Sequence, residues 1–123
     1  MALLNNIKHI NKEGSTKPTR YYSDKQEKAI AKHFNGTQTK NSGATTWQKS
    51  DVLLNNFNIE AKTKTTASES ISIKKEWLEK TVKETLLTGK KYSALAFSFG
   101  PGEPNYYIID QELMDILVDK VDY

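Results

Sequence analysis

Apolar residues recur at helical spacing in three segments of the chain, which predicts three helices. They cover residues 23–35, about 73–88, and the segment that follows residue 110. Each boundary carries a local signal of the kind that begins or ends helices. The signals are a capping box at Ser23, the stop Asn35-Gly36, the N-cap Ser72, Gly89 just past the second helix, and the N-cap Asp110.

Runs typical of strands lie between these helices. Residues 92–99 and 106–109 are apolar and aromatic, and the Gly- and Pro-rich segment 100–105 joins them. The polar stretch 37–50 is loop-like, with residues 45–48 as a short strand. Helices and strands thus alternate along the chain. This order predicts an α/β domain with a central mixed β-sheet flanked by helices.

The central strands cover residues 51–54 and 57–64, and they are joined by Asn55-Asn56, which tolerate the positive φ of a tight turn. Facing residues in such a hairpin have numbers that sum to 111, so Asp51 faces Glu60. The pattern supports this register because it sorts apolar and polar residues onto different faces. One face holds Val52, Leu54, Phe57, Ile59 and Ala61, and the other holds Asp51, Asn58, Glu60, Lys62 and Lys64.

Length and composition narrow the class of protein. A chain of 123 residues with 37% hydrophobic residues forms one domain with one modest core. It has no apolar run of the roughly 20 residues that span a membrane, and its N-terminus lacks the features of a signal peptide, so we expect a soluble, cytoplasmic protein. It also has no cysteine and only two histidines. Any metal must therefore be held by oxygen ligands.

Charge is spread unevenly along the chain. Residues 1–50 carry nine Lys/Arg and three Asp/Glu, whereas residues 101–123 carry one and six. A basic N-terminal half favours a polyanionic partner, because neutralisation of phosphates dominates nucleic-acid affinity. We interpret residues 1–20 as a basic N-terminal arm ahead of a domain at residues 21–123.

The facing carboxylates Asp51 and Glu60 suggest a site of chemistry. With Cβ atoms about 5 Å apart, they repel by about 3 kcal/mol at an effective dielectric near 20. A hard divalent cation removes this repulsion, since Mg²⁺ binds one or two carboxylates together with water and phosphate oxygens. Lys62 lies on the same face, where it can orient a phosphate or the attacking water. The alternative is an ordinary solvent-exposed polar face without function.

At these residues the chain resembles a nuclease family. Asp51 followed by the segment Ile59-Glu60-Ala61-Lys62 is similar to the D…(D/E)XK signature of the PD-(D/E)XK nuclease superfamily. The similarity covers about residues 23–110. The length and the basic N-terminal portion resemble the small archaeal and phage-type Holliday junction resolvases. The resemblance implies a restriction-endonuclease-like core and an origin in a bacterium, an archaeon or a phage.

The resemblance also implies roles for individual residues. Asp51 and Glu60 would be metal ligands, with the Ala61 carbonyl as a third, and Lys62 would be the catalytic lysine. Glu27 matches an additional acidic residue of many members, as a ligand or as a partner of the ligands. The alternative for Glu27 is a helix-surface residue that interacts favourably with the helix N-terminus. The implied cofactor is Mg²⁺, with Mn²⁺ as a substitute.

Other residues are candidates for DNA contacts. Basic and small residues near the motif suit a phosphate backbone, although a single lysine is more commonly just solvated. Aromatic residues can stack on exposed bases or anchor a loop to its own core. The first group is Arg20, Ser42, Gly43, Lys64, Lys74 and Lys75, and the second is Tyr21, Tyr22 and Trp47.

These observations together predict a metal-dependent, structure-selective DNA endonuclease, specifically a Holliday junction resolvase. Two cuts on one four-way junction need two active sites, so we expect a homodimer. One alternative is a restriction-like or replication and repair nuclease of the same fold. Another is a non-catalytic nucleic-acid-binding module.

Overall fold

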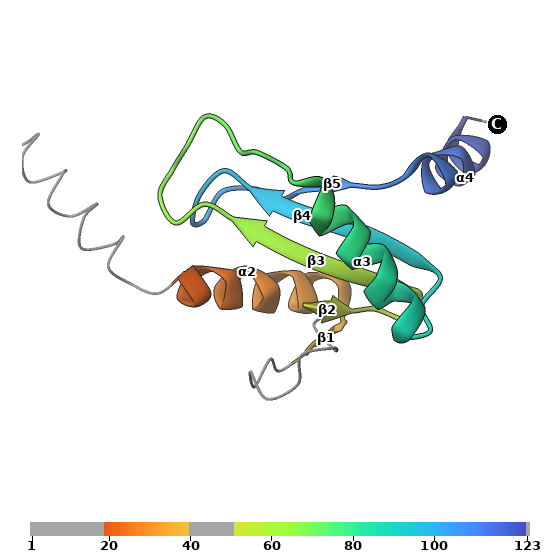
Figure 1. Ribbon diagram of the computed structural model, residues 1–123, viewed down its shortest axis with the longest axis horizontal. Coiled ribbons are helices and arrows are strands. Elements are labelled where there is room, and N and C mark those ends of the chain that lie inside the picture. The colour runs from red at the N-terminus through yellow and green to blue at the C-terminus, as the bar shows by residue number, and fades with distance from the viewer. Residues whose placement is uncertain (1–18, 40–50, 123) are drawn as a thin grey trace, which may run out of the picture.

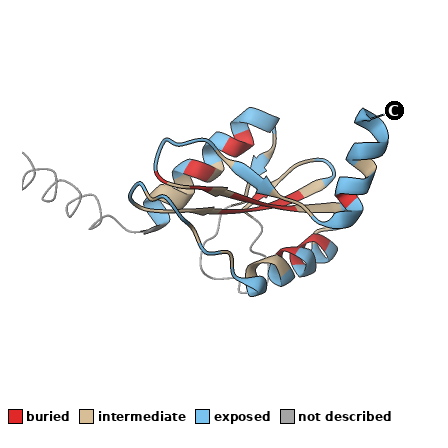
Figure 2. Ribbon diagram, turned by 90° about the horizontal axis from the view of Figure 1, so that it is seen from above, coloured by how far each residue is buried: buried red, intermediate tan, exposed pale blue. Residues whose placement is uncertain are grey.

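A mixed five-stranded sheet forms the centre of the structure, a computed structural model that describes residues 19–39 and 51–122. Helices α2 and α3 cover its opposite faces, and α4 lies beyond the end of β5 (Figures 1 and 2). This arrangement confirms the expected α/β class with a mixed sheet between helices. The elements are α2 Thr19–Phe34, β1 Thr37–Gln38, β2 Val52–Leu53, β3 Phe57–Thr63, α3 Lys75–Leu87, β4 Tyr92–Ser98, β5 Tyr106–Ile108 and α4 Gln111–Val121.

The strands follow the order β1-β2-β3-β4-β5 across the sheet. Strands β3 and β4 are parallel, and the other neighbouring pairs are antiparallel. A parallel pair needs a crossover, and α3 supplies it between β3 and β4. This crossover places α3 over the face of the sheet to which the polar residues of β3 point. The expected N-terminal arm, apart from residues 19 and 20 in α2, and the expected strand at residues 45–48 lie outside the described residues.

The predicted register of the central hairpin is confirmed. Val52 pairs with Ile59 and Leu53 pairs with Asn58, so the facing numbers sum to 111. Asp51 comes directly before this ladder, and its carboxylate accepts a hydrogen bond from the N–H of Ala61, the residue after Glu60.

The turn of this hairpin differs from the prediction. Among the described residues Asn35 is the one non-glycine residue with positive φ, at 57°, so Asn55-Asn56 do not adopt the expected positive-φ turn. The carbonyl of Asn56 instead accepts a 2.9 Å hydrogen bond from the N–H of Tyr92 at the start of β4. A tertiary contact therefore helps to hold the turn, which local sequence could not predict.

The polar face of β3 is buried at Asn58 and Glu60 and partly exposed at Lys62, so the alternative of an ordinary solvent-exposed face is wrong for the two residues that α3 covers. Asn58 is 0% exposed and Glu60 is 2% exposed, because α3 lies over them. The Asn58 side-chain amide donates to the carbonyl of Thr81 and to the hydroxyl of Thr85, both at 3.1 Å. The opposite face packs against α2 in an apolar core of Ile30, Ala31, Val52, Ile59, Ala61, Ala94 and Ala96.

Two predicted helix starts are wrong. Helix α2 begins at Thr19, and the Ser23 hydroxyl donates back to the Arg20 carbonyl at 3.2 Å, as serine does inside a helix. Helix α3 begins at Lys75 after Lys74, so Ser72 is not its N-cap. Lys74, the residue before α3, makes no side-chain cap hydrogen bond, so α3 begins without a local cap.

Three other helix boundaries are confirmed. Asn35 ends α2 with a φ of 57°, and Gly89 follows α3 with a φ of 70°, which is the left-handed conformation of helix C-termini. The Asp110 carboxylate accepts a 2.9 Å hydrogen bond from the Leu113 N–H and caps α4. Within the described parts of the chain, no helix has the length and apolar character needed to cross a bilayer.

Candidate active site

Asp51 is fastened to the neighbouring strand that carries Glu60. It lies directly before β2, and its Oδ2 atom accepts a 2.7 Å hydrogen bond from the backbone N–H of Ala61 in β3. This bond continues the β2–β3 pairing beyond the end of β2 by means of a side chain. Asp51 and Glu60, the two predicted acidic ligands, are thus brought together on the side of β3 that faces β2. We call them the acidic pair.

Glu60 is a buried carboxylate with one oxygen bound to cations and the other without a partner. Its Oε1 atom lies 3.1 Å from the Lys80 ammonium and 3.6 Å from that of Lys62. Its Oε2 atom is buried and accepts no hydrogen bond from an N–H or hydroxyl group of the described residues, while a hydrogen bond between Glu60 and Asp51 forms only when Asp51 is protonated. A buried carboxylate oxygen without a donor is costly, so this atom is suited to a cation.

The protonation of Asp51 reflects the crowding of negative charge. Burial, together with the neighbouring charges of Glu60 and Glu27, raises the pKa of Asp51 to about 8, against the opposing effect of the hydrogen bond from Ala61. Near neutral pH the acidic pair therefore keeps a proton in the absence of another cation. A bound divalent cation would favour the charged form of both side chains instead.

Glu27 lies on α2 and interacts with the acidic pair through its charge. Its Oε1 atom accepts a 3.2 Å hydrogen bond from the Gln38 amide, which also donates to Asp24 at 2.7 Å. Burial raises the pKa of Glu27. In the described part of the chain no three Asp, Glu or His side chains converge closely enough to hold a metal. This geometry favours Glu27 as a partner of the acidic pair over Glu27 as a third carboxylate ligand.

Lys62 extends from β3 toward α3. Its Nζ atom lies 3.6 Å from Glu60 Oε1 and 4.6 Å from the centroid of the Trp77 ring. The Lys74 ammonium lies 5.8 Å from the same ring. Cation–π contacts of this kind hold an ammonium group in place while leaving it able to meet an anion. Trp77 was expected only as an apolar residue of its helix, so the sequence did not indicate its place in the site.

Lys80 is a further site residue that the sequence did not indicate. It comes from α3, donates to Glu60 at 3.1 Å, and lies 4.0 Å from Glu84 Oε1. Burial lowers the pKa of Lys80, but the charge of Glu60, the hydrogen bond to it and the charges of Glu84 and Asp51 together outweigh burial, so the pKa is raised. The spacing of Trp77, Lys80 and Glu84 does place them on one helical face. Which face of the sheet they cover is visible only in the structure.

The predicted DNA-contacting residues are spread over two elements and a loop. Lys74 and Lys75 are exposed at the start of α3, Lys74 beside the Trp77 ring, and Lys64 follows directly after β3. Arg20 is exposed in the first turn of α2. Tyr21 and Tyr22 contact each other edge to face, with ring centroids 5.1 Å apart. Ser42, Gly43 and Trp47 lie outside the described residues.

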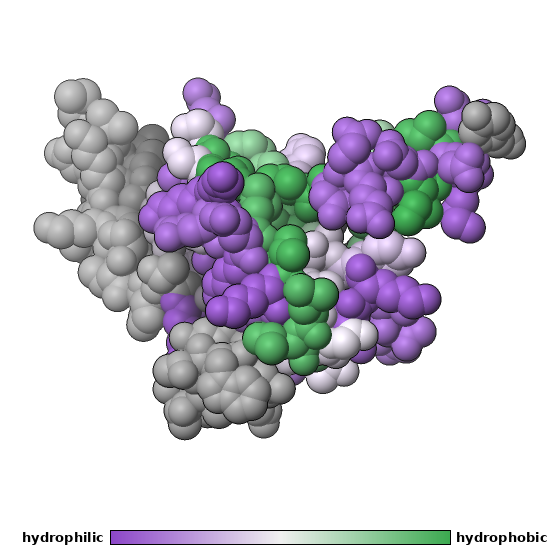
Figure 3. Space-filling view, turned by 45° about the vertical axis from the view of Figure 1, so that its right-hand side comes forward, coloured by the Kyte–Doolittle hydropathy of each residue, from purple (hydrophilic) through white to green (hydrophobic). Residues whose placement is uncertain are grey.

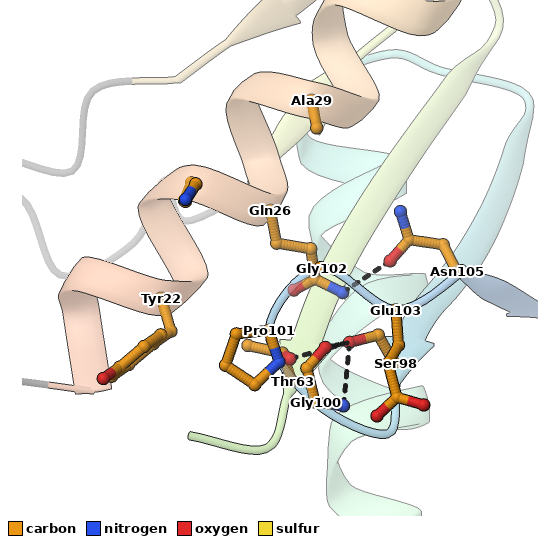
Figure 4. Close-up of a pocket in the computed structure, with 11 residues that line it drawn as sticks. Tyr22, Gln26, Ala29, Thr63, Ser98, Gly100, Pro101, Gly102, Glu103 and Asn105 are labelled. Atoms are coloured by element: carbon orange, nitrogen blue, oxygen red, sulfur yellow. Dashed lines mark hydrogen bonds between the residues drawn. The ribbon is translucent and has the colours of Figure 1, made fainter. Parts of the chain in front are cut away.

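A cavity of about 230 Å³ lies behind the strand that carries Lys62, at the carboxyl ends of β3 and β4 (Figure 4). The Gln26 amide lines it and donates to the Lys62 carbonyl and to Asn105 Oδ1, both at 2.9 Å. Because Gln26 is on α2, these bonds fix the backbone of Lys62 from the face opposite to α3. Nothing in the helical pattern of α2 distinguished Gln26 from a surface residue.

Comparison with protein-family models, with curated proteins and with solved structures finds no match for this chain. The assignment of a function therefore depends on the chemistry of the side chains that the fold brings together. They are two carboxylates at one strand edge, two ammonium groups on the same carboxylate oxygen, and an indole ring beside one of them.

Proposed function

We propose that the protein is a metal-dependent DNA endonuclease of the PD-(D/E)XK type, with a restriction-endonuclease-like core, that hydrolyses phosphodiester bonds in branched DNA. The observation that carries the proposal is the acidic pair, buried Glu60 beside half-buried Asp51, with an unpartnered Glu60 oxygen one residue before Ala61 and two before Lys62. Neighbouring carboxylates with little access to solvent need a proton or a cation between them, and a divalent ion bound by oxygen is the cation that also serves phosphate chemistry.

The residues present fit Mg²⁺ or Mn²⁺. Asp51 and Glu60 would each provide a carboxylate oxygen. The Ala61 carbonyl would be a third ligand. The N–H and C=O groups of a strand residue point toward the same side of the strand, and the Ala61 N–H already points toward Asp51. Three protein ligands leave positions for water and phosphate oxygens, which Mg²⁺ prefers. When bound, the ion supplies Lewis-acid chemistry at the phosphate.

The protein's own side chains have separate tasks in this proposal. Lys62, positioned by Glu60 and Trp77, orients the phosphate or the attacking water. Glu27 acts on the acidic pair through its charge and not as a direct ligand. Lys74 and Lys75, exposed at the start of α3, and the half-buried Lys64 after β3 neutralise the DNA backbone. Arg20 on α2 is a further contact.

A four-way junction cut by a homodimer is the substrate that we propose. Helix α4 leaves Met114, Leu117, Val118 and Val121 exposed, Val121 by 82%. These apolar side chains lie beside strongly polar ones on the same helix (Figure 3). Such a face on a terminal helix supports a contact with a second copy, which would provide the second active site. Sedimentation analysis should show a dimer that L117D disrupts.

The test is cleavage of a synthetic four-way junction and of a linear duplex with the same arms, with Mg²⁺ and with a chelator. We expect cleavage of the junction only with metal. D51N and E60Q should lower its rate by at least about a hundredfold and keep DNA binding. Glu79, exposed on α3, provides the matched control E79Q, which should cleave normally.

Three results would change the assignment. Cleavage that persists in both D51N and E60Q would remove these residues from the active site. Equal cleavage of duplex and junction would favour the restriction-like or repair nuclease. DNA binding without any metal-dependent cleavage would favour the non-catalytic binding module.

A further inference from the structure

We propose that Lys80 is an internal cation of the acidic pair that opposes the binding of a divalent metal to Glu60, and that it moves away from Glu60 Oε1 when the metal binds to the free Oε2 atom. The inference rests on the proposed metal site at Asp51 and Glu60. It adds a regulatory residue, on a different element, that the nuclease signature does not contain.

The ammonium group of Lys80 contacts the carboxylate of Glu60, which would be a ligand of the metal. Its Nζ atom is 3.1 Å from Glu60 Oε1, closer than the 3.6 Å of Lys62. The Lys62 ammonium group also lies 4.6 Å from the centroid of the Trp77 ring, so it has a second favourable contact besides Glu60. Lys80 is therefore the principal counter-charge of this buried carboxylate among the described residues.

Occupancy by both cations is unfavourable. Mg²⁺ binds its oxygen ligands at about 2.0–2.1 Å. A metal at that distance from the free Oε2 atom would lie within several ångströms of the ammonium group that is held at 3.1 Å from Oε1 of the same carboxylate. Repulsion between the two cations in a partly buried site weakens metal binding, and it falls when the ammonium group turns away. The side chain of Lys80 is 43% exposed, and its long stem can turn its charge toward solvent without disturbing the core.

The released ammonium has an obvious anionic partner. A phosphodiester that approaches the metal brings negative charge to the position that Lys80 faces, and lysine binds phosphate as a point charge. Metal and DNA would then load together, because DNA stabilises the form in which Lys80 has left Glu60. Lys80 would thus keep the site charge-balanced and metal-poor until the substrate arrives.

The experiment is Mn²⁺ and Mg²⁺ titration of the full chain by calorimetry, without DNA. K80M should bind the metal about tenfold more tightly than the unsubstituted protein, because the competing charge is gone. K80R should bind like the unsubstituted protein, since it keeps the charge. K83M is the matched control, at an exposed position of the same helix, and should not change the affinity.

The outcomes separate this inference from the proposed function. If the unsubstituted protein binds metal and K80M binds it equally or more weakly, the role of Lys80 is refuted and the nuclease proposal stands. If no variant binds metal, or if binding survives in the D51N and E60Q variants, both the role of Lys80 and the proposed nuclease site are refuted. Thermal unfolding checks that K80M is folded, and K80Q replaces it if it is not. In the unsubstituted protein, Mg²⁺ should also shift the NMR signal of the Lys80 side chain and leave that of Lys83 in place; an unmoved Lys80 signal would refute the inference.

Discussion

The backbone N–H of Ala61 donates a 2.7 Å hydrogen bond to the carboxylate of Asp51, and this single bond joins the residue before β2 to the strand that carries Glu60. In a regular β-ladder the acceptor of this N–H would be a backbone carbonyl, whereas here it is the side-chain carboxylate of Asp51. The consequence is a pair of acids at one strand edge with their orientation fixed from the backbone. The predictions below follow from this pair and from the elements that hold it.

The metal-free protein should lose stability as the pH rises toward about 8. The pKa of Asp51 is raised from an ordinary value of 3.8 to about 8, so the folded chain binds this proton more tightly than the unfolded chain does. The stabilisation is fully present below the unfolded value and disappears as the pH rises through the folded value. Urea unfolding in a chelator at about pH 5 and about pH 9 measures it.

The variant D51N is the control for this pH dependence. It removes the titrating group together with a repulsion of about 3 kcal/mol, so its unfolding free energy should change less over the same interval. Excess Mg²⁺ should reverse the trend in the unsubstituted protein, since the metal binds the deprotonated pair. Stability of the metal-free protein that rises with pH over this interval would contradict the assignment.

Removing the Trp77 ring should slow cleavage without unfolding the protein. W77A deprives the Lys62 ammonium of the ring at 4.6 Å, and a loss of roughly 2- to 30-fold in single-turnover rate is expected for a cation–π contact. W77F should retain most of the rate. Leu86 on the same helix is 77% exposed, so L86A is a suitable control. A rate for W77A equal to that of the unsubstituted protein would show that the ring does not position Lys62.

Asn58 should be a main source of stability for the contact between β3 and α3. N58A removes the amide that donates a 3.1 Å hydrogen bond to the Thr85 hydroxyl, and it opens a small cavity. The free energy of unfolding should therefore fall by about 2 kcal/mol. Denaturant unfolding gives the value. N56A, in the exposed turn of the same hairpin, should change stability by less than about 0.5 kcal/mol. Equal effects of the two substitutions would argue against the buried amide as an anchor.

Gly36 should tolerate no side chain. A Cβ atom there would lie 2.8 Å from the Leu53 carbonyl oxygen, in contact with backbone that cannot move freely. G36A should therefore destabilise the protein by about 1–3 kcal/mol and lower cleavage, because Leu53 belongs to the strand next to Asp51. T37A, at the exposed neighbouring position, is the comparison. Unchanged stability in G36A would mean that the end of α2 can move away from β2.

The local sequence determined much of the framework. Alternation of apolar and polar residues in the central hairpin predicted the observed pairing of Val52 with Ile59, because a slip of one residue would have turned the apolar side chains away from the core. Asn35, Gly89 and Asp110 ended or began helices as predicted, since each acts through its own backbone conformation or through a neighbouring N–H. The nuclease activity and its metal remain predictions.

Tertiary structure alone decided how the candidate site is enclosed. The periodicity of α3 indicates which of its residues share a face, but it carries no information about which strand that face will cover. Only the crossover from β3 through α3 to β4 brings Lys80 and Trp77 over Glu60 and Lys62. Burial, the unpartnered oxygen of Glu60 and the raised pKa of Asp51 arise from that packing, because electrostatic interactions depend on distance in space and not on separation along the chain.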